Sequence, residues 1–247
     1  MAIETLPEPS IPITTPFRPR LGFLTATPII ATATVCLLLI IAMAILAPFL
    51  APHDPQLLAP AQRLKPSSAQ FLLGTDGYGR DVLSRIIYGA RISLLIGLGA
   101  AVFSVSIGLV IGLVSGFFKW VDAVMMRVMD GLMAIPSILL AIAVVSLSGA
   151  SLMTVMIAIT IPEIPRVARL VRSVVLSARE EPYVEAAISV GSSLPKIMWR
   201  HLMPNTVAPL IVQGTYVCAS AVLTEAILSF LGAGISPETP TWGNIMA

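Results

Sequence analysis

Charged residues are scarce in this chain of 247 residues. Asp, Glu, Lys and Arg together make up 11% of it, whereas 56% of the residues are apolar and the mean hydropathy is +0.91. A soluble domain of this composition would expose large apolar patches to water. The shortage of charge therefore excludes an ordinary soluble domain and indicates an integral membrane protein.

Lysine is nearly missing. Lys65, Lys119 and Lys196 are the only lysines, and none ends a phosphate-binding loop of the form G-x-x-x-x-G-K-[ST]. ATP bound in that way must therefore be bound by another chain. We expect no catalytic residue and no cofactor in this chain.

Histidine and cysteine are equally rare, with two of each. His53 and His201 exclude an H-E-x-x-H helix, and Cys36 and Cys218 lie in apolar segments without a ligand neighbour at short spacing. We expect no metal site and no disulfide. The net charge of +2, without a basic run, also excludes a nucleic-acid partner.

The apolar residues run continuously instead of alternating, which favours helices over a membrane barrel. The sequence thus predicts an all-α, polytopic bundle of transmembrane helices with the lipid bilayer as its surroundings. A span needs about 20 apolar residues. Five spans are expected, at residues 29–50, 91–118, 129–148, 151–168 and 206–231.

The first 28 residues are polar and rich in proline, which predicts a disordered tail. A cleavable signal peptide is the alternative, but residues 29–47 are long for one and lie far from Met1. With the tail in the cytoplasm, ten of the fifteen Lys and Arg residues lie inside, in line with the positive-inside rule. The loop at 51–90 is then extracytoplasmic, and the loop at about 166–205 is cytoplasmic, within a core domain at 91–247.

The cytoplasmic loop contains two short helical patterns. Tyr183, Val184, Ala187, Ile188 and Gly191 share one face, with Glu185 and Ser189 turned away. A stop at Gly191-Ser192-Ser193 precedes a second helix, with Ser193 as N-cap, that Pro204-Asn205 ends. On spacing alone, an amphipathic hairpin lying on lipid would explain the loop as well.

This loop resembles the E-A-A loop of permeases from binding-protein-dependent ABC importers, through Glu185, Ala186, Ala187, Gly191 and Pro204. His201 stands where many members carry an aliphatic residue. The segment Arg200-His201-Leu202-Met203-Pro204-Asn205 is similar to the branch that handles dipeptides, oligopeptides and nickel, specifically its second, C-type permease.

Three further segments resemble the same branch in the same order. They are Leu73-Gly74-Thr75-Asp76-Gly77-Tyr78-Gly79-Arg80-Asp81-Val82, Leu228-Ser229-Phe230-Leu231-Gly232 and Trp242-Gly243. The resemblance covers about residues 25–247. Members usually continue into a sixth span that is absent here, so the chain is truncated, the gene model is short or that helix is dispensable.

The resemblance implies a non-enzymatic permease subunit in the bacterial inner membrane, with its N-terminus in the cytoplasm. It would form a path for peptides or a related small solute, including nickel. Its partners would be a homologous second permease, two ATPase subunits and an extracytoplasmic substrate-binding protein. Tyr183, Glu185, Ala186, Ala187, Gly191 and Pro204 would couple the path to the ATPases.

Other residues allow two hypotheses each. The outer turn with Gly74, Asp76, Gly79, Arg80 and Asp81 either pairs its charges internally or contacts the binding protein. Small residues recur every four positions at Ala100, Ser104, Gly108, Gly112 and Gly116, and permit close helix packing within the chain or against a second permease.

Glu225, in the last span, either serves the pathway or makes a packing hydrogen bond. A charge there must face protein or water. Asp130 and Arg127 are expected to mark the membrane boundary.

Two other protein classes remain as alternatives. A secondary transporter should show inverted repeats with broken helices, and no internal duplication is evident. A structural membrane anchor would explain neither the outer turn nor the inner loop.

Overall fold

The computed structural model describes residues 28–247, so the predicted disordered tail lies, except for Pro28, outside the described residues. The chain divides into two compact units, one ending at Leu39 and the other running from Ile40 to Ala247. Within the described range the secondary structure is helical, apart from an isolated bridge between Thr75 and Asp81. The predicted all-α class is confirmed.

Helix α2 spans Pro28–Ile45 and crosses the limit between the units. Its apolar side chains point outward, Val35, Leu38 and Leu39 among them, as expected for a helix in lipid. The predicted span 29–50 is broken at Leu46, after which α3 covers Ala47–Leu50. Pro48 accounts for the break, because it cannot donate a backbone hydrogen bond to the preceding turn.

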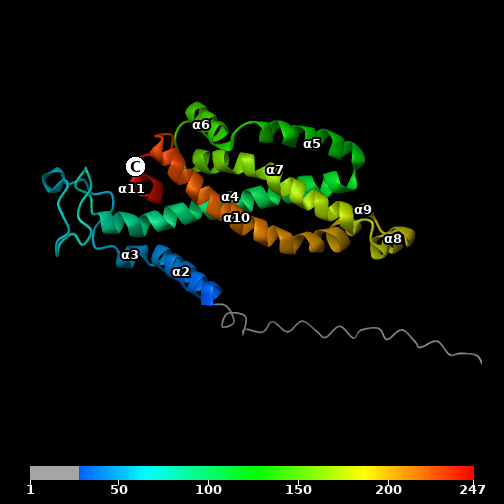
Figure 1. The fold of residues 1–247 in the computed structure, drawn as a ribbon, viewed down its shortest axis with the longest axis horizontal. Helices are drawn as coiled ribbons and strands as arrows, with labels where there is room; N and C mark the ends of the chain where they lie inside the picture. Colours follow the sequence, from blue (N-terminus) through cyan, green and yellow to red (C-terminus); the bar gives the residue numbers. More distant parts are fainter. Residues whose placement is uncertain (1–27) are drawn as a thin grey trace, which may run out of the picture. The chain divides into compact units, whose positions relative to one another are not determined.

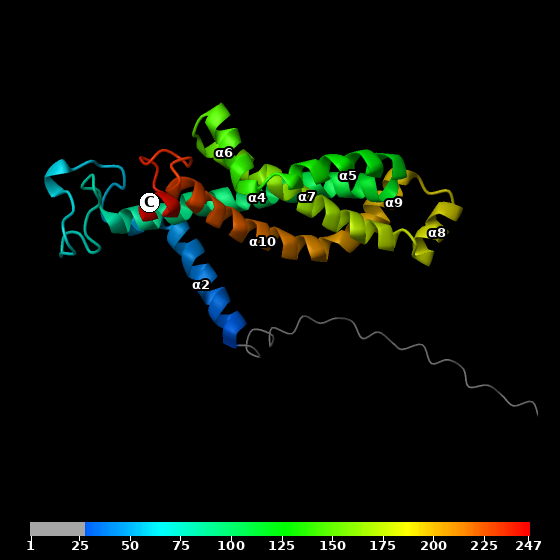
Figure 2. The same ribbon diagram turned by 45° about the horizontal axis from the view of Figure 1, so that its top comes forward.

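Three long helices form the core of the second unit: α4 (Val82–Phe117), α7 (Leu152–Ala178) and α10 (Met203–Phe230). Helix α4 packs against both of the others (Figures 1 and 2). The loop at 51–81 and helix α11 (Trp242–Met246) lie at one end of this bundle, and α8 (Pro182–Ser189) lies at the other. We call these the loop end and the α8 end.

Small residues bring α4 and α7 together. A Cβ atom added to Gly108, Gly112 or Gly116 would lie 2.5 to 2.7 Å from the Cβ atom of Val167, Val171 or Val175, respectively. Both sets repeat every four residues, so glycines on one helix face valines on the other. The small residues that the sequence singled out thus lie against a helix of the same chain.

Helix α4 begins nine residues earlier than the predicted span. Asp81 caps it, since its side chain accepts a hydrogen bond from the backbone N–H of Ser84. The predicted outer loop 51–90 thus includes the first turns of α4. At 36 residues, α4 is about 54 Å long and exceeds a bilayer core of about 30 Å.

The predicted span 129–148 is two helices, α5 (Lys119–Ala134) and α6 (Ser137–Ser148), which meet at 88°. Pro136 stands at the bend. It forces Ile135 into an extended conformation, which is incompatible with a continuous helix. The predicted span 129–148 is thus divided between the end of α5 and α6, and the bent pair can still count as one span.

Helix α7 continues ten residues beyond the predicted span, through Pro162 and Pro165 and on to Ala178. The predicted loop 166–205 therefore begins with helix. Among residues 28–247, three helices are long and apolar enough to cross a membrane, or four if the bent pair counts as one span. Helix α7 is not among them, because Glu163 and three arginines interrupt its apolar residues, and the predicted span 151–168 stays a prediction.

The remaining elements are short. They are the 3-10 turn η1 (Pro60–Gln62), α9 (Leu194–Ile197) and the π-helical turn η2 (Met198–Leu202), which leads directly into α10.

Candidate functional site

Helix α8 has defined signals at both ends. Pro182 occupies its first turn, where a missing N–H costs nothing. At its other end Gly191 has φ +81°, with hydrogen bonds from Gly191 N to Ile188 O and from Ser192 N to Ala187 O. This pair of bonds is a Schellman motif, which needs a left-handed residue at the glycine position. The predicted stop at Gly191 thus has a local physical cause.

The face of α8 that contacts the bundle is narrow. Val184 is fully buried and Ala187 partly so, in a cluster with Val175, Ile197 and Leu202. Glu185 and Ala186 are exposed. Tyr183 and Ile188, which were predicted to share the face of Val184 and Ala187, are exposed as well.

The second helix of the loop does not end at Pro204. Residues 194–230 form one helical run, in which η2 joins α9 to α10. The N–H of Met203 bonds to Met198 O five residues back, and Pro204 then stands in the first turn of α10. Proline is tolerated there, so the expected break is absent. Ser193 lies at the predicted N-cap position but makes no side-chain capping bond.

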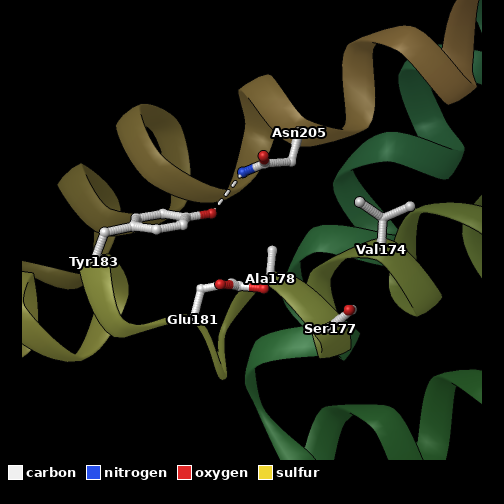
Figure 3. A pocket seen from close by; sticks show the side chains of 6 residues that line it. All are labelled: Val174, Ser177, Ala178, Glu181, Tyr183 and Asn205. Carbon is white, nitrogen blue, oxygen red and sulfur yellow. Dashed lines mark hydrogen bonds between the residues drawn. The ribbon is translucent and has the colours of Figure 1, made fainter. Parts of the chain in front are cut away.

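A polar contact joins α8 to the start of α10. Asn205 Nδ2 donates to Tyr183 Oη at 3.0 Å and to His201 O at 2.6 Å. Figure 3 shows this contact at the rim of an open hollow of about 350 Å³, lined also by Val174, Ser177, Ala178 and Glu181. Asn205 was not among the residues predicted to form the site. Its place after Pro204 was the only sequence signal.

The outer-turn charges lie together at the loop end. Asp76 accepts hydrogen bonds from the backbone N–H groups of Tyr78 and Arg80, and from Arg80 Nε at 2.7 Å. Burial alone would raise the pKa of Asp76, but these bonds and the Arg80 charge outweigh it and hold that pKa below its usual value. The Asp76 carboxylate is thus paired within the chain.

Arg80 and Arg85 connect the turn to the other end of the sequence. Arg80 Nη1 and Arg85 Nη2 donate to Pro237 O, at 2.9 and 3.1 Å. Arg85 also donates to Pro55 O at 3.4 Å and lies 3.7 Å from Asp76. Arg85 was not among the predicted site residues, since nothing in the local sequence distinguishes it from a charge flanking a span.

Two glycines in the turn occupy positions that other residues cannot take easily. Gly74 has φ +77° and Gly79 has φ +78°. A Cβ atom on Gly79 would lie 1.9 Å from Ala59 O, and one on Gly74 would lie 2.5 Å from Lys65 O. These glycines allow the turn to fold closely onto residues 59–65.

Glu225 faces the chain's own C-terminal segment. It is fully buried, and its Oε1 accepts hydrogen bonds from Ser229 Oγ and Thr241 Oγ1, both at 2.8 Å. Thr241 in turn caps α11 by accepting from Asn244 N at 3.1 Å. The structure gives Glu225 packing bonds, and a role in the pathway stays a prediction.

Three arginines on α7 pair with acidic residues, two of which lie on α5 and one on α7. Arg172 binds Asp122 with two hydrogen bonds, and Arg169 binds Asp130, so both arginines contact α5. Arg166 pairs with the buried Glu163 at 2.8 Å on α7 itself. Glu163 was overlooked, and Asp130 pairs with a neighbouring helix.

The predicted residues thus gather in two places. The loop residues from Tyr183 to Pro204 lie at the α8 end, and the outer turn and Glu225 lie at the loop end. The glycines of α4 lie between them, against α7.

Two family models match the chain. Residues 104–247 match the binding-protein-dependent transport system inner membrane component, and residues 29–66 match the N-terminal transmembrane domain of oligopeptide transport permease C. The loop from Tyr183 to Pro204, the segment Leu228–Gly232 and Trp242-Gly243 lie within the first match, and the outer turn at 73–82 lies between the two matches.

Curated relatives agree with the family models. A probable peptide ABC transporter permease of Sinorhizobium fredii is 52% identical over 78% of this chain and 67% of its own length. A di/tripeptide permease of Pseudomonas aeruginosa is 44% identical, over 85% and 72%. A glutathione permease of Pectobacterium atrosepticum is 41% identical, over 85% and 70%. The chain therefore belongs to the inner-membrane permeases of binding-protein-dependent ABC importers, and among them to the C-type permeases of peptide importers.

Proposed function

We propose that this chain forms, with a homologous second permease, the membrane path of a peptide importer. Relatives named for peptides, di- and tripeptides and glutathione support a substrate with peptide bonds. Two ATPase subunits bind the ATP that drives transport, and an extracytoplasmic binding protein delivers the substrate. The α8 end faces the cytoplasm with the N-terminus, and the loop end faces outward.

Helix α8 is the part that couples the path to the ATPases. The observation that carries this proposal is a short helix with defined ends, exposed Glu185 and Ala186 on one side and buried Val184 on the other. A partner that pushes on the exposed side moves the helices behind it. Such a push shifts an equilibrium only through contacts that differ between the two states, and a rigid helix provides them.

Crosslinking tests the contact. In intact cells, Ala186→Cys should crosslink to an ATPase subunit, whereas Ser236→Cys at the loop end should not. Cys36 and Cys218 are replaced by Ala in both variants. Absence of an ATPase crosslink from position 186 would contradict the proposed coupling.

Two substitutions test the mechanism. Gly191→Pro cannot adopt φ +81°, and Glu185→Lys reverses an exposed charge, so both should insert normally but lose peptide uptake at least about tenfold. Glu238→Lys, an exposed charge reversal at the loop end, is the matched control. Uptake of labelled dipeptides by vesicles is the measurement. Normal uptake in both α8 variants would refute the mechanism, and uptake of nickel instead of peptides would refute the substrate.

A further inference from the structure

Helix α8 has few contacts that fix its position. Val184 and Ala187 pack against the bundle, but the hollow lies beside Tyr183. This space is an open hollow in the described part of the chain, and Figure 3 shows the side chains that line it. The apolar contacts therefore fix α8 only through Val184 and Ala187. The orientation of its first turn depends on other bonds.

The bond from Asn205 to Tyr183 is placed to do this. An asparagine amide has two N–H donors. His201 O, a backbone carbonyl, can only accept a hydrogen bond, so it fixes which side of the Asn205 amide is the nitrogen. The second N–H then points to Tyr183 Oη at 3.0 Å.

Asn205 donates to a carbonyl in an irregular helical turn. His201 belongs to η2, a π-helical turn of five residues, and such turns are single interruptions that occur often at functional sites. Along the chain, α8 reaches α10 only through the Gly191 corner, α9 and this turn. The Tyr183–Asn205 bond provides a direct connection that bypasses all three.

We propose that Tyr183 and Asn205 are positioning residues for coupling, because their hydrogen bond transmits the displacement of α8 to the base of α10. This inference rests on the proposed function. When the ATPases move α8, Tyr183 carries Asn205 with it and turns the first residues of α10. Without the bond, the same push bends the Gly191 corner and is lost.

A double-mutant cycle tests this in the complete importer, reconstituted in vesicles, with peptides transported per ATP hydrolysed as the readout. Tyr183→Phe keeps the ring and removes only the acceptor oxygen. It should lower the transport ratio about fivefold while ATP hydrolysis continues. Asn205→Ala should lower it at least as much, and adding Tyr183→Phe to Asn205→Ala should change nothing further. Tyr216→Phe, at an exposed tyrosine farther along α10, is the control.

An equal loss from Tyr183→Phe with and without Asn205→Ala would mean that Tyr183 acts on another partner, and would overturn the inference. An unchanged ratio in Tyr183→Phe would overturn it as well. The Ala186→Cys crosslink is measured in parallel. If it forms while Tyr183→Phe couples normally, the inference alone fails, whereas a missing crosslink in the parent importer means that the proposed function fails.

Discussion

At the scale of single residues, Glu225 and Thr241 hold a loop onto the bundle. Thr241 donates to Glu225 and accepts from the backbone of α11, so one hydroxyl serves both elements. Gly243 is part of the same contact, since a Cβ there would lie 2.7 Å from Ala226 Cα and 3.1 Å from Glu225 Oε1. The segment 232–241 therefore depends on a buried carboxylate inside α10.

Replacing Glu225 by Leu should release this segment. Two buried hydroxyl groups, of Ser229 and Thr241, then lose their acceptor, at a cost of about 1–3 kcal/mol. Labelling of Ile235→Cys, a buried position, by a membrane-impermeant maleimide should accelerate. Glu225→Gln retains an acceptor oxygen and should label slowly. Equal labelling of the Leu and Gln variants would show that the carboxylate position does not hold the segment.

At the scale of elements, the contact of α4 with α7 depends on the absence of side chains. Gly112 comes closer to the α7 backbone than Gly108 or Gly116 does, because an added Cβ would lie 2.7 Å from Ala168 O, and also 2.5 Å from Val171 Cβ. A neighbouring backbone oxygen cannot rotate out of the way as a flexible side chain can. Close packing of this kind is a common basis of helix association in membranes.

Gly112→Ala should therefore destabilise the protein by about 1–3 kcal/mol, although alanine favours helices. Gly131→Ala is the matched control, since nothing lies within 4 Å of its added Cβ atom. Thermal unfolding in detergent is the measurement. If both variants unfold at the same temperature, the two helices are not as tightly packed as described.

Helix positions were predictable from the sequence because apolar length is a local property. The effect of each proline was not, since Pro136 breaks a helix whereas Pro162, Pro165 and Pro209 lie inside helices. Packing against neighbouring helices decides whether a break or a continuous helix costs less free energy. The positions of those neighbours cannot be read from the sequence around the proline. The motif residues of the α8 end were found by pattern. Asn205 was not, because its partner Tyr183 lies 22 residues away.

The arginines of α7 show the same limit of local patterns. Arg169 and Arg172 looked like loop residues, and the structure places them in a helix. Their partners Asp130 and Asp122 lie 39 and 50 residues earlier, beyond the reach of any local pattern. A charge alone therefore does not end a helix.

At the scale of the whole molecule from Ile40 onward, sequence-distant segments meet at the loop end. Residues 51–81, the start of α4 and the segment around Pro237 share the two arginines. Trp242 adds bonds from its indole N–H to Ile86 O at 3.1 Å and from its backbone N–H to Ser93 Oγ at 3.2 Å. These contacts bind α4, the loop and α11 into one body.

Arg85→Met should loosen this body, because two backbone carbonyls lose a buried donor at once. The expected cost is about 1–3 kcal/mol. Cleavage of the loop by protease added outside spheroplasts should become about tenfold faster. Arg91→Met, at an exposed arginine on the same helix, should leave cleavage unchanged. Identical cleavage in both variants would contradict the role given to Arg85.

Because Arg80 and Arg85 both bind Pro237 O, these two hydrogen bonds can form only after residue 237 has been synthesised. The carbonyl lies 157 and 152 residues after its donors, so a ribosome adding about 5–20 residues per second needs roughly 8–30 seconds to reach it. During that interval both guanidinium groups lack this acceptor, while later helices are still being inserted into the bilayer. Nascent loops would then be most open to quality-control proteases before the last helix arrives.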